Sequence, residues 1–134
     1  EHFMKMANPL WNKIIFTGYL CKKQLEELYA LSTVGVIPSF HEELGYIAIE
    51  MFMHKLPIVC SDASGLIEVT DNGECAIMIH DWCNTLQLFP LKEALRKVLS
   101  NISYQKELKE KGRSKYLNAY SLDVYQKKIG LFYQ

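Results

Sequence analysis

The sequence lacks the features that mark several large classes of protein. Lysine plus arginine and aspartate plus glutamate number 15 each, so the formal net charge is zero, and no basic block is present. Proteins that bind nucleic acid normally carry a basic patch that neutralises phosphates, so we expect no nucleic-acid partner. No hydrophobic run approaches the ~18 residues of a membrane span, and no signal peptide is visible.

Cysteines are few, and their spacing does not suit a metal site. They are Cys21, Cys60, Cys75 and Cys83. The sequence contains no C-x-x-C pair and no histidines at zinc-finger spacing, so we expect neither a metal nor another cofactor. Cys60 and Cys75 sit in apolar runs, where reduced thiols are common, and a reducing, cytoplasmic location fits them best. A G-x-G-x-x-G motif is also missing, which disfavours a dinucleotide oxidoreductase.

The composition is that of a folded domain. Of the 134 residues, 49% are hydrophobic and 22% are charged. A chain of this length buries about two-thirds of the surface that its unfolded form exposes, and we treat residues 1–134 as a single domain. The sequence starts inside an apparent helix, Glu1–Met6, so we expect it to be a fragment of a larger protein.

Four short apolar runs predict the strands of a parallel sheet. They are rich in β-branched residues and apolar throughout, as in strands buried on both faces. The runs are Lys13–Thr17, Val34–Pro38, Pro57–Ser61 and Cys75–Ile79. Helical patterns separate them at Lys22–Leu31 and Gly45–His54, whereas Ala63–Gly73 is short and rich in turn formers. Alternating strands and helices indicate an α/β fold, a Rossmann-like parallel sheet flanked by helices.

After Ile79 the pattern becomes helical to the end of the chain. The predicted helices are Phe89–Asn101, Ser103–Ala119 and Ser121–Phe132. Ser121, with Asp123 in the first turn, suits a helix start. Lys106–Lys115 interleaves charges of both signs and indicates a solvated helix face rather than a membrane surface. The larger aromatics, Tyr29 among them, read as packing residues.

The stretch from Pro38 to Pro57 carries the most functional information. Glu42 and Glu50 flank a Leu-Gly-Tyr turn that is expected to open a helix directly after a buried strand. Ligands of open parallel sheets bind outside the carboxyl ends of strands. Gly45 lets a phosphate approach the backbone, where helix N-terminal amides favour anions, and carboxylates accept hydrogen bonds from vicinal hydroxyls. The stretch therefore predicts a site for a sugar joined to a diphosphate.

A structural explanation of the same residues stays open. Glu42 and Glu43 can simply complement the helix dipole, and Glu50 can be the polar position of an amphipathic helix. The segment Ser61–Glu68 strengthens the functional interpretation, because it leaves the next strand as another polar, glycine-containing loop on the same sheet edge. Its Asp62 suits a site and a turn equally well.

Taken in order, these elements resemble the C-terminal domain of retaining glycosyltransferases of the group-1 family, which have the two-domain GT-B fold. The motifs are Pro-Ser-x-x-Glu after a strand, a Pro-led strand, Ser-Asp-x-x-Gly-x-x-Glu and Asn-Gly-x-x-Ala. The family's Glu-x7-Glu signature falls on Glu42 and Glu50. The match runs in register from about Ile14 to Ile79, and Tyr120-Ser121-Leu122 is similar to the family's Tyr-Ser-Trp.

The resemblance implies a nucleotide-sugar donor and assigns residues to its parts. Glu50 would accept hydrogen bonds from the ribose hydroxyls. Glu42, the catalytic residue, would contact the donor sugar and hold it for front-face transfer with retention. The amides around Leu44, Gly45 and Tyr46 would bind the diphosphate.

The resemblance also implies a base position, further partners and a location. Gly18 and Tyr19 would lie near the nucleotide base. Amides and basic side chains would stabilise the diphosphate without a metal. An N-terminal acceptor domain would lie outside this chain. Membrane association, peripheral and at the inner face, would come only through the complete protein.

Several positions depart from the family pattern. Met51 and Lys55 stand where a small residue and glycine are usual, Ser64 replaces a glycine, and Ile67 replaces a frequent proline. The family's Gly-Arg and Lys, which grip the diphosphate, would lie before Glu1. We therefore expect half a donor site and no catalysis by this chain alone.

Two other functions stay open at this point. A GT-B nucleotide-sugar epimerase would share the fold and the ligand class but would not need paired glutamates at this spacing. A non-enzymatic α/β interaction module of receiver type would carry an acidic cluster after the first strand and a strand-end lysine. Neither feature is found in the sequence.

Overall fold

Three parallel strands form the centre of the fold. The computed structural model describes residues 2–82 and 88–132. The strands are β1 (Gly35–Ile37), β2 (Ile58–Ser61) and β3 (Ile77–Ile79), in the order β1-β2-β3. Both pairings are parallel, with Val36 opposite Val59 and Cys60 opposite Met78. The predicted α/β class is confirmed, with three of the four predicted strands in place.

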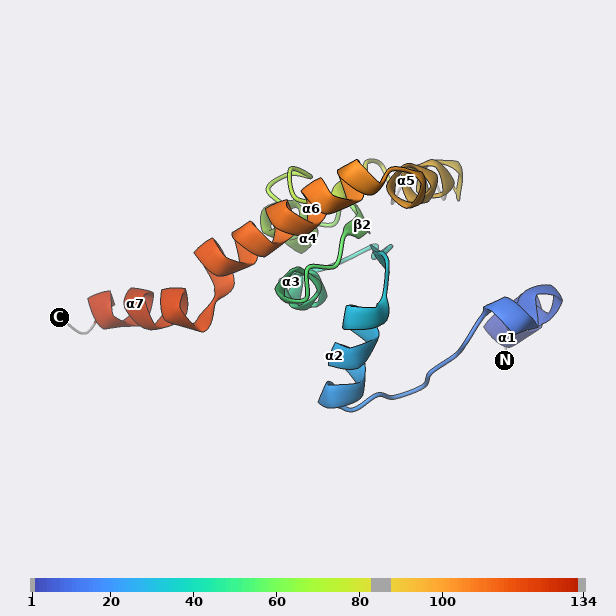
Figure 1. Cartoon of the computed structure of the whole chain (residues 1–134), viewed down its shortest axis with the longest axis horizontal. Helices are drawn as coiled ribbons and strands as arrows, with labels where there is room; N and C mark the ends of the chain where they lie inside the picture. The colour runs from blue at the N-terminus through green and yellow to red at the C-terminus, as the bar shows by residue number, and fades with distance from the viewer. Residues whose placement is uncertain (1, 83–87, 133–134) are drawn as a thin grey trace.

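The prediction of a strand at Lys13–Thr17 is wrong. The chain forms a 3₁₀ helix, η1 (Asn8–Lys13), and then continues as irregular chain up to α2. Together with α1 (His2–Ala7), this segment lies away from the sheet (Figure 1), and Ile15 is 87% exposed. β-branched residues favour an extended backbone, but a strand also needs a neighbour that completes its hydrogen bonds. Among the described residues no strand pairs with this segment.

Two helices occupy their predicted places, α2 (Lys22–Leu31) before β1 and α3 (Tyr46–Met53) between β1 and β2. A third, short helix, α4 (Ser64–Val69), lies between β2 and β3. Most of α3 is apolar, and both Ala48 and Phe52 are fully buried. Burying a side chain of the size of Phe52 contributes about 1.5–3 kcal/mol. The turn-rich pattern of Ala63–Gly73 did not predict α4, because Gly65 in its first turn is a poor helix former.

The C-terminal part of the chain is helical, as predicted. It comprises α5 (Leu88–Ser100), α6 (Ile102–Lys115), the π-helical segment η2 (Tyr116–Tyr120) and α7 (Leu122–Phe132). Asn101 caps α6, since its side-chain oxygen accepts from the amide of Tyr104 at 2.9 Å. Helix α6 packs against α3 and α5, and α7 extends beyond the rest of the fold (Figure 1). No helix within residues 2–82 and 88–132 is long and apolar enough to cross a membrane.

Strand β2 is buried on both faces of the sheet. Ile58 and Cys60 belong to one apolar cluster, which includes Phe52 of α3. Val59 belongs to a second cluster, with Ala94 of α5. Successive residues of a strand point to opposite faces, so β2 joins the two halves of the core. The prediction of burial on both faces holds at every position of β2 but not for β1, where Val36 is 38% exposed.

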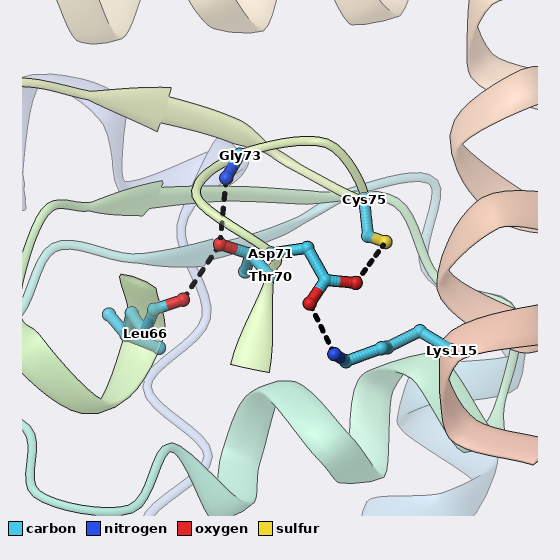
Figure 2. A network of polar contacts seen from close by, with 6 residues as sticks. All are labelled: Leu66, Thr70, Asp71, Gly73, Cys75 and Lys115. Atoms are coloured by element: carbon cyan, nitrogen blue, oxygen red, sulfur yellow. Dashed lines mark hydrogen bonds and ion pairs between the residues drawn. The ribbon is translucent and has the colours of Figure 1, made fainter. Parts of the chain in front are cut away.

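A polar network fixes the turn between α4 and β3 (Figure 2). The hydroxyl of Thr70 donates to the carbonyl oxygen of Leu66 at 2.7 Å and accepts from the amide of Gly73 at 3.2 Å. The carboxylate of Asp71 accepts a hydrogen bond from the ammonium group of Lys115. Because Lys115 is the last residue of α6, this ion pair ties the C-terminal helices to the turn.

Candidate functional site

The loops that follow β1 and β2 are bonded to one another. The buried hydroxyl of Ser61, at the end of β2, donates to the carbonyl oxygen of Ser39 at 2.6 Å. Further along, the carbonyl oxygen of Glu42 accepts from the amide of Gly65 at 2.7 Å and from the hydroxyl of Ser64 at 3.1 Å. The prediction that the two loops share one edge of the sheet is confirmed.

Two glycines allow these loops to touch backbone to backbone. A Cβ on Gly65 would lie 2.6 Å from the carbonyl carbon and oxygen of Glu43 and 2.7 Å from the nitrogen of Leu44. A Cβ on Gly45 would lie 3.1 Å from the carbonyl oxygen of Gly65. The first turn of α4 therefore supports the loop that carries the predicted diphosphate-binding residues.

Gly45 directs the start of α3 and holds Glu42. Its φ of +65° is a left-handed conformation that residues with a Cβ rarely adopt. The Gly45 amide donates to Oε1 of Glu42 at 3.2 Å. Glu42 thus complements the helix terminus, as the structural explanation proposed. Its other carboxylate oxygen has no protein partner among the described residues, so the side chain is held in place and can still accept from a ligand.

The amides next to Gly45 are arranged to bind an anion. A helix leaves its first N–H groups without intrahelical partners, and its dipole makes this end positive. For the N–H groups of Tyr46 and Ile47 no acceptor is found within the described ranges. The side chains of Leu44 and Tyr46 are 57% and 65% exposed, so the loop is open to solvent.

Glu50 faces a groove between α2 and α3. Its Oε2 accepts a hydrogen bond from the hydroxyl of Tyr29 at 3.1 Å. Tyr29 is buried, and its ring lies 5.6 Å from that of His54, centroid to centroid. The groove encloses about 240 Å³, and Lys22 also lines it. The sequence predicted Tyr29 as a packing residue. Its polar tip on an apolar helix stripe is the signal that could have indicated a second role.

The Tyr29 phenol is held in its neutral form. Burial raises the pKa of Tyr29 to about 12, and the charge of Glu50 and the hydrogen bond to it act in the same direction. A phenol with such a pKa keeps its proton over the whole neutral range. Tyr29 is therefore the donor in this contact, and the Glu50 carboxylate is the acceptor.

The remaining predicted residues lie apart from this loop. Gly18 and Tyr19 belong to the irregular segment between η1 and α2. In Figure 1 this segment joins α2 at the end that points away from the sheet. Tyr19 is 95% exposed. The structure does not bring these two residues onto the Glu42 loop, and their role near a base stays a prediction. Asp62 accepts from the amide of Asp81 at 2.7 Å, which joins the segment after β2 to the segment after β3.

The polar groups of the site are amides, hydroxyls and carboxylates. Within residues 2–82 and 88–132 no three His, Cys, Asp or Glu side chains lie close enough together to hold a metal ion. Carboxylates that face solvent beside helix N-terminal amides can accept from hydroxyl groups while the amides donate to an anion. A ligand with both kinds of group would match this arrangement.

Known proteins resemble the chain in sequence. Residues 4–115 match the sequence model of the family described as "Glycosyl transferases group 1". An alpha-maltose-1-phosphate synthase of Mycolicibacterium smegmatis is 25% identical over 114 residues, which cover 78% of this chain and 30% of that protein. An alpha-galactosylglucosyldiacylglycerol synthase of Streptococcus pneumoniae is 29% identical over 139 residues, 98% of this chain and 35% of that protein.

A solved structure shares the fold. Sucrose-phosphate synthase from Thermosynechococcus elongatus, a GT-B protein, superposes with a TM-score of 0.85 at 20% sequence identity. The superposition covers 98% of this chain and 33% of that one. The chain thus spans about a third of the length of these proteins. The resemblance inferred from the motifs is confirmed, and the chain belongs to the group 1 glycosyl transferase family.

Proposed function

We propose that this chain binds the nucleotide-sugar donor of a retaining glycosyl transfer. The observation that carries the proposal is the placement of Glu42. The Gly45 amide holds one oxygen of its carboxylate at 3.2 Å, directly beside the helix N-terminus, and leaves the other oxygen for a ligand. The family match favours a glycosyltransferase over the epimerase and the interaction module that the sequence left open.

Each part of the donor has a matching group on this surface. The diphosphate would accept from the amides around Leu44, Gly45 and Tyr46, of which that of Gly45 also donates to Glu42, and the helix dipole favours negative charge there. Glu42 would accept from a hydroxyl of the donor sugar and hold its anomeric carbon for front-face transfer with retention. Glu50 would accept from the ribose hydroxyls, since a carboxylate has about four acceptor positions.

The donor site is proposed to work without a resident metal. Fixed amides aimed at a developing charge stabilise it without reorganisation, and the N-terminal turn of α3 supplies such groups. We propose that the acceptor binds a part of the complete polypeptide beyond this chain. We also assign the reaction to the cytoplasm, in keeping with the unpaired thiols of Cys60 and Cys75. The metal-free mechanism is tested by measuring glycosyl transfer in excess EDTA. We expect the transfer to persist.

Calorimetric titration tests the donor site. UDP, GDP, ADP and their sugar derivatives are titrated into the complete polypeptide that carries this chain. One of these series should bind, and Glu50→Ala should weaken it by about tenfold or more, because a hydrogen bond to a charged group contributes roughly 1.5–3 kcal/mol. Glu43→Ala is the matched control, since Glu43 is exposed and carries no proposed role. If no nucleotide binds, or if Glu50→Ala binds like the parent protein, the donor assignment is wrong.

A further inference from the structure

We propose that Tyr29 is a positioning residue that holds the Glu50 carboxylate in the orientation required for the donor ribose. The inference rests on the proposed function and adds a residue from a different helix to the site. Tyr29 belongs to α2, before β1, whereas Glu50 belongs to α3, after it. The hydroxyl of Tyr29 lies 3.1 Å from Oε2 of Glu50.

The ring of Tyr29 is fixed, so its hydroxyl is a fixed donor. Only 8% of Tyr29 is exposed, and it belongs to the main apolar cluster with Ile37 and Ala48. The ring of His54 lies against it at a centroid distance of 5.6 Å. A buried aromatic side chain has few alternative rotamers in a close-packed core. The phenol oxygen therefore has a fixed position in the groove.

Glu50, in contrast, is an exposed side chain, and a fixed hydrogen-bond donor can orient its carboxylate. Ordering a glutamate costs rotamer entropy, which a free side chain would lose on binding the ligand. In the part of the chain that the structure describes, Tyr29 is the one protein group found bonded to the Glu50 carboxylate. Preordering by Tyr29 shifts this loss from the binding step to the folding step.

A neutral donor suits this task better than a cation. One hydrogen bond to Oε2 leaves Oε1 and the second lone pair of Oε2 for a vicinal diol. Among the described residues no cation is paired with the Glu50 carboxylate, so its negative charge remains to strengthen hydrogen bonds from hydroxyl groups. A lysine or arginine in place of Tyr29 would neutralise this charge and occupy more of the acceptor positions.

The chemistry predicts a specific readout. A group that orients a ribose-binding carboxylate should contribute to the affinity for nucleotides with both ribose hydroxyls. It should contribute little for a 2′,3′-dideoxy counterpart, in which the hydroxyls are missing. Tyr29→Phe retains the buried ring and removes only the hydroxyl, so it separates positioning from packing.

The test is calorimetric titration of the complete polypeptide with UDP, GDP or ADP, whichever binds, and with its 2′,3′-dideoxy analogue. Tyr29→Phe should weaken the ribonucleotide about tenfold, the effect of losing about 1.4 kcal/mol, and leave the dideoxy analogue unchanged. In a Glu50→Gln background, Tyr29→Phe should have a much smaller effect, because the two groups act together. Tyr125→Phe, at an exposed tyrosine of α7, is the matched control.

The alternative outcomes are distinguishable. If no nucleotide binds to the parent protein, the proposed function and this inference both fail. If the parent binds and Glu50→Gln weakens binding, but Tyr29→Phe leaves the affinities for both the ribonucleotide and the dideoxynucleotide unchanged, only the inference is overturned. An equal loss for both ligands would also overturn it, because that result indicates a structural role for the hydroxyl.

Discussion

The amide of Gly65 donates a hydrogen bond of 2.7 Å to the carbonyl oxygen of Glu42, and this bond connects the loops that follow two neighbouring strands. Gly65 belongs to α4, outside the Glu-x7-Glu motif. Its missing side chain lets α4 approach the Glu42 loop within backbone contact. The shape of the candidate site therefore depends on residues that supply no ligand-binding side chain.

Replacing Gly65 should disturb the site through this contact. Gly65→Ala would place a Cβ 2.6 Å from the carbonyl group of Glu43, and that backbone must shift to make room. We expect a loss of about 1–3 kcal/mol in unfolding free energy, as for other overpacked sites, and weaker donor binding. Chemical denaturation and calorimetry measure the two effects. Ser64→Ala, which removes one 3.1 Å hydrogen bond, is the milder control, and we expect it to lose about 1 kcal/mol of unfolding free energy. Unchanged donor affinity in Gly65→Ala would show that the contact does not shape the site.

The ion pair of Asp71 and Lys115 should stabilise the fold without affecting the ligand. Lys115→Met removes the pair that ties α6 to the turn after α4 (Figure 2). The Lys115 side chain is only 19% exposed, so we expect a loss of about 1 kcal/mol, at the upper end for ion pairs of this kind. Lys111→Met removes an i,i+4 pair with Glu107 and should lose less, because the Lys111 side chain is more exposed to solvent than that of Lys115. Equal unfolding midpoints for the two variants would contradict the expectation that the Asp71–Lys115 pair stabilises the fold more than the Glu107–Lys111 pair does.

The raised pKa of Tyr29 predicts a loss of stability in alkali. The pKa of Tyr29 is about 12 in the folded protein, against an ordinary value of 10.0. The folded state therefore binds this proton more tightly than the unfolded state does. The contribution of Tyr29 to the free energy of unfolding is complete below pH 10 and is lost as the pH rises from about 10 to 12. Burial raises the pKa of Cys60 to about 12 as well, so part of the slope belongs to that thiol.

Tyr29→Phe isolates the tyrosine contribution. Unfolding free energies measured from pH 9 to 12 should fall less steeply in Tyr29→Phe than in the parent protein. Parallel pH profiles for the two proteins would mean that Tyr29 titrates as it does in the unfolded chain. The contact with Glu50 would then be absent in solution.

The thiols should differ sharply in reactivity. Cys21 is exposed, whereas Cys60 and Cys75 are 1% and 7% exposed. Burial also raises the pKa of both buried thiols, which lowers their thiolate fraction. With Cys83→Ser removing the thiol outside the described residues, Ellman's reagent should react at once with Cys21 and with the other two only after unfolding. Rapid reaction of all three in native buffer would contradict the core assignment.

Local patterns predicted most of the secondary structure. Apolar runs and helical stripes located β1, β2, β3, α2 and α3, because burial in a parallel sheet leaves a continuous apolar signal. The same signal failed at Lys13–Thr17, since a pattern within one segment carries no information on whether a partner strand lies beside it. The helix predicted from Ser103 begins one residue earlier, at Ile102, because the side chain of Asn101 caps it.

Only the part of the candidate site that follows from the topology of the sheet could be predicted. The rule that carboxyl ends of parallel strands share an edge placed Glu42 and Gly65 together, which their 2.7 Å hydrogen bond confirms. The contact between Tyr29 and Glu50 could not be predicted from this rule. It depends on how α2 and α3 pack against each other, and the sequence pattern of neither helix contains that information. Asp62 suited a site and a turn equally well, and its contact with the amide of Asp81 is neither, because it joins the segments that follow β2 and β3.

A structure of the complete polypeptide bound to the nucleotide sugar that it prefers is the most direct test of the account. We predict a ribose hydroxyl within hydrogen-bonding distance of Glu50, a phosphate on the amides of Tyr46 and Ile47, and a donor-sugar hydroxyl on Glu42. A nucleotide bound elsewhere, with the Glu42–Glu50 surface left to solvent, would contradict the central claim.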